Sequence, residues 1–72
     1  MSRSPNPAKG IGKDVRQARE GRGWSQHELA AAASVSRPTI ARVEGGENVS
    51  TGTLEKIAGA LGYKLAIEKE AN

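Results

Sequence analysis

The sequence predicts an all-α domain of four short helices, followed by one short β-strand. Three observations predict it: apolar residues recur at helical spacing in separate segments, serines able to cap a helix precede most of these segments, and glycines follow them. The chain has 72 residues and no cysteine. We therefore expect one small domain without disulfides, and a cysteine-based metal site is excluded.

The first helix is predicted to run from Ile11 to the stretch "EGRG". Ile11, Val15 and Ala18 follow the spacing i, i+4, i+7, which places them on one face of a helix. The glycines of "EGRG" are typical of a helix end. Residues 1–10 are rich in Ser, Pro, Asn and basic side chains, so we expect a disordered N-terminal arm before this helix.

The second helix is predicted to begin at "SQHE", which forms a capping box. The Ser25 side chain can accept a hydrogen bond from the backbone of Glu28, and the Glu28 carboxylate can reach back to the backbone of Ser25. Leu29, Ala32 and Ala33 are expected to face the core. Because alanine is small, neighbouring helices can approach this helix closely.

The third helix is predicted to follow the turn "SVS", with Ser36 as its N-cap and Gly45 and Gly46 at its end. Pro38 suits a first helical turn, where backbone N–H groups need no intrahelical partner. Because a proline disfavours α geometry in the residue before it, the helix begins either at Arg37, directly after the cap, or at Pro38.

This third helix has an apolar face and a basic face. At ~100° per residue, Ile40 and Val43 share one side, and Pro38 and Arg42 lie almost opposite Ile40. Arg37 sits at the N-terminal corner of the basic face. Arginines with small neighbours suit insertion into a DNA groove, because arginine can bind guanine through two hydrogen bonds. Taken alone, however, such a face is more often a solvated surface.

The fourth helix is predicted with Ser50 as its cap, residues 53–61 as its body and Gly62 as its end. Its apolar residues recur at i, i+3, i+4 and i+7 and are Leu54, Ile57, Ala58 and Leu61.

The period changes to two in residues 63–70, where Tyr63, Leu65 and Ile67 alternate with their neighbours as in a half-buried strand. A single strand cannot satisfy its own backbone hydrogen bonds. The segment is therefore either a frayed tail or a strand that pairs with the same strand of a second copy. Pairing, which the alternation favours, would make these three residues the interface of a symmetric homodimer.

The order of the elements, two capped helices joined by a short turn, is a helix-turn-helix arrangement. The stretch "GWSQHELAAAASVSRPTIARVEGG" resembles the helix-turn-helix of the Cro/C1 (Xre-type) DNA-binding regulators, and "TLEKIAGALG" resembles the fourth helix of that family. The resemblance covers residues 11–62. It implies a compact four-helix domain like that of the lambda repressor, with double-stranded DNA as its partner.

The resemblance also implies a role for each matching residue. The residues that would contact base edges are Arg37, Pro38, Thr39 and Arg42. The residues expected beside DNA phosphates are Ser25, Gln26, His27, Ser36 and Asn48. Family members often pair an arginine of the first helix with the glutamate that closes the third, and Arg19 and Glu44 occupy those places. We therefore expect a partly buried ion pair between them.

The chain departs from the family pattern at two positions and in one loop. Ser34 stands where the family usually has glycine, so a positive φ there would strain the backbone by about 1 kcal/mol. Pro38 is unusual at its position, which affects the angle at which the third helix would enter a groove. The loop "GGENVS" has no lysine, so its phosphate contacts fall to backbone N–H groups or Asn48.

Three further side chains have ordinary structural interpretations. Trp24 is expected to be a core aromatic, because it replaces the apolar residue before the cap of the second helix. Arg16 and Arg22 are expected to be solvated.

Composition and motifs limit the classes of function. The formal net charge of +3 permits nucleic-acid binding without requiring it. No apolar run has membrane-spanning length and no secretory signal is recognisable, so we expect a cytoplasmic bacterial protein. No nucleophile–base set, metal-ligand cluster or glycine-rich phosphate loop is recognisable either. We therefore expect neither catalysis nor a cofactor.

Two functions follow from these observations. The first is a transcriptional repressor that binds a palindromic operator as a homodimer, with residues 36–44 in the major groove. The second is an antitoxin similar to HigA-like and HipB-like proteins, which would neutralise a toxin protein and repress its own operon.

Overall fold

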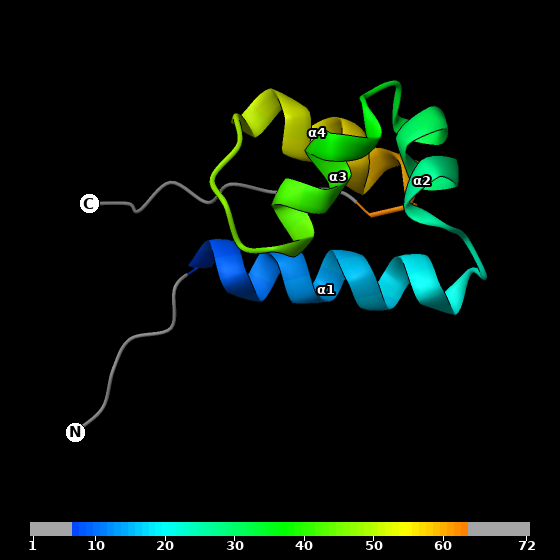
Figure 1. The fold of residues 1–72 in the computed structure, drawn as a ribbon, viewed down its shortest axis with the longest axis horizontal. Helices are drawn as coiled ribbons and strands as arrows, with labels where there is room; N and C mark the ends of the chain where they lie inside the picture. Colours follow the sequence, from blue (N-terminus) through cyan, green and yellow to red (C-terminus); the bar gives the residue numbers. More distant parts are fainter. Residues whose placement is uncertain (1–6, 64–72) are drawn as a thin grey trace.

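The computed structural model describes residues 7–63, with side chains from residue 10 onward. They form four α-helices: α1 (Pro7–Gly21), α2 (Gln26–Ala33), α3 (Arg37–Glu44) and α4 (Thr51–Ala60). The long helix α1 runs along one side of the molecule, and the three shorter helices gather on the other side of it (Figure 1). The prediction of an all-α helix-turn-helix domain is confirmed for this part of the chain.

Helix α1 begins at Pro7, four residues earlier than the predicted start at Ile11. Residues 7–10 of the predicted arm are therefore helical, and that part of the prediction is wrong. A proline suits the first helical position because its φ is already near the helical value and its missing N–H would have no partner there. Residues 1–6, the rest of the predicted arm, lie outside the described residues.

The core lies where α1, α2, α3 and α4 meet. Its buried apolar residues are Val15, Leu29, Ala30, Ala33, Ile40, Val43, Ile57 and Leu61. Ile11, Ala18 and Trp24 are partly buried and pack against this cluster. Valine, leucine and isoleucine side chains stabilise the fold by about 1.5–3 kcal/mol each when fully buried, so the larger members of this small set account for much of the driving force.

The alanines of α2 that face the core differ from those predicted. Ala30 is buried, with 4% of its surface exposed, whereas Ala32 is exposed. The run of four alanines has no polar residue to mark an outer face, so only the packing of α2 against both α3 and α4 decides its rotation. Leu29, Ala30 and Ala33 are the residues that this packing turns inward.

The N-termini of α2, α3 and α4 are capped by the predicted serines. Ser25 accepts from the Glu28 N–H at 3.0 Å, and the Ser25 N–H donates to Glu28 Oε1 at 2.7 Å. Ser36 and Ser50 accept from the backbone N–H groups three residues further on, at 3.3 Å and 3.1 Å. These bonds satisfy donors that the first helical turn leaves without a partner.

The C-terminus of every helix among residues 7–63 ends in the same hydrogen-bonded turn. In each turn a backbone N–H beyond the helix end donates to the carbonyl five residues earlier; the pairs are Trp24–Arg19, Val35–Ala30, Glu47–Arg42 and Tyr63–Ala58. This turn needs one residue with positive φ. Three turns use Gly23, Gly46 and Gly62, with φ of 74°, 89° and 83°.

The turn after α2 uses Ser34 in place of glycine. Its φ is 59° and its ψ is 43°, in the left-handed region. Among residues 7–63 it is the only non-glycine residue with positive φ. The positive φ at Ser34, which we expected to strain the backbone, is present in the structure. This is also the turn that joins α2 to α3.

Close contact between α1 and α3 depends on Gly12, a residue that the sequence analysis did not single out. Gly12 is buried, and a Cβ added to it would overlap the carbonyl oxygen of Val43. The absence of a side chain thus lets the backbone of α1 approach the end of α3.

No helix within residues 7–63 is both long enough and apolar enough to cross a membrane. Of the strand predicted over 63–70, only Tyr63 is described; it lies outside the helices with 63% of its surface exposed. Leu65 and Ile67 lie outside the described residues.

Candidate nucleic-acid interface

Helix α3 presents an apolar face inward and a basic face outward. Ile40 and Val43 are 0% and 2% exposed, whereas Arg37, Pro38 and Arg42 are classed as exposed. The helix begins at Arg37, the earlier of the two expected starts, because the Ser36 cap supports a first turn that contains Arg37. The structure therefore brings these three predicted base-contacting residues to the surface of one short helix.

Thr39, the fourth predicted base-contacting residue, is half-buried. Its Oγ1 lies 2.8 Å from Ser36 Oγ, within the same cap. Its backbone N–H also donates to Ser36 Oγ. Thr39 and Ser36 are thus held together at the N-terminus of α3, with Ser36 exposed.

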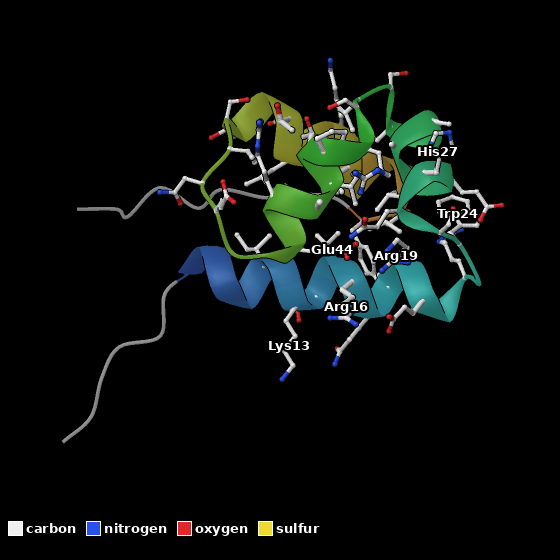
Figure 2. The ribbon with its side chains drawn as sticks, in the orientation of Figure 1. Lys13, Arg16, Arg19, Trp24, His27 and Glu44 are labelled. Carbon is white, nitrogen blue, oxygen red and sulfur yellow. The ribbon has the colours of Figure 1, made fainter. Side chains whose placement is uncertain are left out.

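The predicted phosphate-contacting residues lie on two segments. Ser25, Gln26 and His27 are at the N-terminus of α2, where Ser25 and His27 are exposed and Gln26 is half-buried. His27 projects from the outer side of α2 (Figure 2). Asn48 is exposed in the connection between α3 and α4. Backbone N–H groups and the positive end of the helix dipole make an N-terminus such as that of α2 attractive to phosphate.

Arg19 of α1 and Glu44 of α3 form a bidentate ion pair between the two helices (Figure 2). Arg19 Nε donates to Glu44 Oε2 at 2.7 Å and Nη2 donates to Oε1 at 3.1 Å. Arg19 Nη1 also donates to the carbonyl of Trp24 at 2.8 Å. The side chains of Arg19 and Glu44 are 11% and 6% exposed, so the pair is largely screened from solvent.

The ion pair changes the acidity of Arg19. The hydrogen bond to Glu44 raises the pKa of the Arg19 guanidinium, the charges of Glu44 and Glu20 act in the same direction, and burial opposes them. Arg19 therefore stays charged at any physiological pH, and α3 stays tied to α1.

Gln26 connects this ion pair to Arg37 on the basic face of α3. Its Nε2 donates to Glu44 Oε1 at 3.2 Å, and its Oε1 accepts from Arg37 Nη1 at 3.0 Å. Side chains of α1, α2 and α3 are thus connected in one chain of hydrogen bonds. The sequence pattern indicated separate roles for Gln26 and Arg37 and gave no sign of this link.

We expected Arg22 to be solvated, but in the structure it contacts other parts of the protein. Its Nη2 donates to the Leu61 carbonyl at 2.8 Å, and its guanidinium lies 5.2 Å from the centre of the Trp24 ring. A cation at the end of α4 complements the helix dipole.

Trp24 is half-buried and packs against the core, as expected. Arg16 is exposed and pairs with Glu20 at 3.1 Å.

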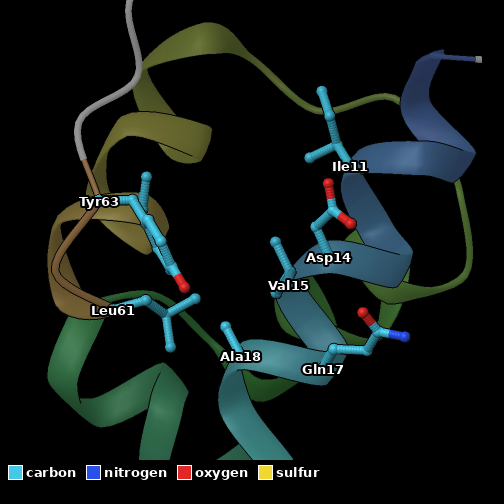
Figure 3. Close-up of a pocket in the computed structure, with 8 residues that line it drawn as sticks. Ile11, Asp14, Val15, Gln17, Ala18, Leu61 and Tyr63 are labelled. Carbon is cyan, nitrogen blue, oxygen red and sulfur yellow. The ribbon is translucent and has the colours of Figure 1, made fainter. Parts of the chain in front are cut away.

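A groove of about 490 Å³ lies between α1 and the end of α4 (Figure 3). Leu61 and Tyr63 form one wall, and Ile11, Val15 and Ala18 face them from α1. Asp14, Gln17 and Ala58 complete the lining. The groove holds Tyr63, the one described residue of the predicted dimer interface.

These features indicate an interface for an acidic, grooved surface. Arg37 and Arg42 are exposed on a short helix whose opposite side is buried. Within residues 7–63, no cluster of three or more His, Cys, Asp or Glu could hold a metal ion.

Comparison with known proteins agrees with this geometry. A family model described as helix-turn-helix matches residues 15–67. A similar solved structure is that of the clp gene regulator ClgR from C. glutamicum, with 29% sequence identity and a TM-score of 0.78 over 90% of this chain and 85% of that chain. The comparison with curated proteins gave no match. The chain belongs to the Cro/C1-type helix-turn-helix family of DNA-binding transcription regulators.

Proposed function

We propose that the protein represses transcription by binding a palindromic operator as a homodimer, with α3 of each copy in the major groove. The observation that carries the proposal is the exposed face formed by Arg37, Pro38 and Arg42 on a helix whose other side is buried. Since side chains at such a face can reach base edges without moving the backbone, the domain can read sequence as a rigid body.

The bases are read by the residues of α3. Arg37 and Arg42 each suit a two-bond contact to guanine O6 and N7, and the ring of Pro38 suits contact with a thymine methyl group. The threonine methyl of Thr39 offers a similar apolar contact.

The phosphates on either side of the DNA major groove are bound by polar groups around α3. These are Ser25, Gln26, His27, Ser36 and Asn48. Ser25 Oγ accepts from Glu28, so its own O–H is free to donate to a phosphate oxygen. The second N–H of the Gln26 amide is free in the same way, because the first is bound to Glu44.

The second copy binds through Tyr63 and the strand predicted over 63–70. Tyr63 is a large exposed apolar side chain beside a groove lined mainly by apolar residues, and such surfaces mark sites of protein association. A two-fold dimer would place its α3 helices in successive major grooves about 34 Å apart. A protein that acts on a bacterial operator acts in the cytoplasm.

Selection of bound duplexes from a random pool tests this function. We expect the selected sequences to contain two inverted half-sites, and the mass of the complex to correspond to two chains on one duplex. Selection of no sequence would contradict the proposal, and a single half-site bound by one chain would contradict its dimer.

The antitoxin alternative makes a different prediction. A cognate toxin would copurify with this chain as a second polypeptide and would lose its activity when the chain is added. Operator binding without such a polypeptide would favour the repressor.

A further inference from the structure

We propose that Arg22 is a positioning residue for the proposed dimer interface, because it holds the turn after α4 that carries Tyr63. The inference rests on the proposed function, since it concerns the surface that would receive a second copy. It gives Arg22, which lies apart from the basic face of α3, a role in assembly rather than in contact with DNA.

The end of α4 is tied to another part of the described chain by a single hydrogen bond. Helix α4 packs mainly against α2, and α1 packs mainly against α3, so helix packing does little to fix the end of α4 beside α1. Arg22 Nη2 donates to the Leu61 carbonyl at 2.8 Å. Among residues 7–63, no other hydrogen bond joins α4 or the turn Leu61–Tyr63 to another element.

Arg22 reaches this carbonyl from a fixed position. The connection after α1 is closed by hydrogen bonds from the backbone N–H groups of Arg22 and Trp24 to the Arg19 carbonyl, both at 3.1 Å. The Arg22 guanidinium lies 5.2 Å from the centre of the Trp24 ring, a distance at which ring and cation attract each other. On the side of α4 it lies close to Gly62, where an added Cβ would be 3.1 Å from Arg22 Nη2.

The residues that Arg22 holds form one wall of the groove beside α1. Leu61, whose carbonyl accepts from Arg22, and Tyr63 form this wall opposite α1 (Figure 3). The Tyr63 N–H donates to the Ala58 carbonyl at 2.8 Å and closes the turn. Tyr63 is therefore placed before a second copy arrives. A surface that is already ordered loses less conformational entropy on association.

Dimerisation of Arg22 variants tests the proposal. Arg22→Met keeps a long side chain but removes its charge and its donors, so we expect the dissociation constant of the dimer to rise about 2- to 10-fold. Arg22→Lys, which keeps the charge and a donor, should recover most of that loss. Arg16→Met is the matched control: it removes an exposed arginine that pairs with Glu20 of its own helix, and it should leave the dissociation constant unchanged.

A second control separates positioning from overall stability. Ile40→Val removes a methyl group from a fully buried residue of α3 that does not line the groove. It should lower the Tm and leave the dissociation constant of the dimer unchanged, provided that association is measured well below the thermal transition.

Hydrogen exchange in the monomer needs no second copy. In dilute protein, the Tyr63 N–H should exchange faster in Arg22→Met than in the unmodified protein or in Arg16→Met, because the turn that it closes would open more often. The Glu47 N–H closes the corresponding turn after α3, at 2.9 Å from the Arg42 carbonyl, and its exchange should not change.

The outcomes separate this proposal from the proposed function. If Arg22→Met left either the exchange of the Tyr63 N–H or the dissociation constant of the dimer unchanged, the positioning role would be wrong. An equal loss of dimer in Arg16→Met or Ile40→Val would contradict it too. If the unmodified protein formed no dimer, the dimer of the proposed function would fail, whereas the exchange result would still report whether Arg22 holds the turn.

Discussion

At the scale of single residues, helix α3 carries two arginines in different surroundings. Arg37 is tied to Gln26 through its Nη1, whereas Arg42 lies exposed further along α3. The sequence indicated both residues, because their spacing and the positions of Ile40 and Val43 determine which side of a helix they occupy. It did not indicate the tie to Gln26, which depends on how α2 and α3 pack.

We expect Arg42→Ala to weaken operator binding by about 1–3 kcal/mol and to relax the preference at one base position, because it removes a two-bond contact to a base edge. The measurement is affinity for the operator and for a scrambled duplex of the same length.

Lys13→Ala is the control for Arg42→Ala. It removes the same charge from the side of α1 that points away from α3 (Figure 2), so it should leave the ratio of the two affinities unchanged. If the Arg42→Ala protein still distinguished the operator from the scrambled duplex as well as the unmodified protein does, the assignment of Arg42 as a base-contacting residue would be refuted.

We expect Ser34→Gly to raise the free energy of unfolding by about 1 kcal/mol, because glycine adopts the φ of 59° without strain. For a domain of this size that corresponds to an increase of about 4–8 °C in Tm. Ser34→Ala, which keeps the Cβ, should give no such increase in a thermal denaturation experiment. Equal effects of the two substitutions would show that strain is not the cause.

At the scale of helices, the ends were easier to predict than the faces. Serine caps and glycine stops act through hydrogen bonds within a few residues, so "SQHE" and the glycines after α1, α3 and α4 identify these ends from sequence. The inward face of α2 depends on its neighbours, and Ala30 was missed for that reason. Gly12 was missed because glycine in a helix has no local signal for a close helix contact.

We expect Gly12→Ala to destabilise the protein by at least about 1–3 kcal/mol, since its Cβ would overlap the Val43 carbonyl and force α1 away from α3. Gly10→Ala in the same helix is the control. A Cβ at Gly10 meets no atom, so alanine there should stabilise the helix by about 0.5–1 kcal/mol. Chemical denaturation measures both, and two changes of the same sign would contradict the close packing at Gly12.

The ion pair between α1 and α3 leads to a further prediction. Glu44→Gln should lower the free energy of unfolding by about 3 kcal/mol, because it leaves the largely buried Arg19 without its counter-charge. Since the pKa of Arg19 is raised in the folded state, the stabilisation is complete throughout the neutral range and is lost only as the pH rises through that pKa in strongly alkaline solution.

Glu20→Gln is the control for Glu44→Gln. Its partner Arg16 and Glu20 itself are 63% and 53% exposed, and exposed pairs contribute at most about 1 kcal/mol. Denaturation at neutral pH compares the two variants. If both variants lost the same free energy of unfolding, burial of the Arg19–Glu44 pair would add nothing to stability.

At the scale of the whole molecule, α3 and the groove beside Tyr63 lie on different parts of the domain. We propose the first surface for DNA and the second for another copy of the chain, so both can be occupied together. The groove could not be predicted from the sequence, because its walls come from opposite ends of the described chain, α1 and the turn after α4.

We expect Tyr63→Asp to shift the protein from dimer to monomer and to weaken operator binding, because a charge would enter the apolar interface. Tyr63→Phe should preserve both properties. Sedimentation measures the association, and titration of the operator measures the affinity. A Tyr63→Asp protein that still dimerises would place the interface elsewhere.

The sequence by itself determined the number and order of the helices, their caps and stops, and the basic outer face of α3. Each of these depends on residues within about one or two helical turns of one another, so local spacing is sufficient. Tertiary structure alone decided the rotation of α2, the contact at Gly12, the engagement of Arg22 with the Leu61 carbonyl, and the hydrogen bonds that join Arg19, Glu44, Gln26 and Arg37. Those contacts join residues that are distant in sequence, and they form only when the helices pack around their shared core.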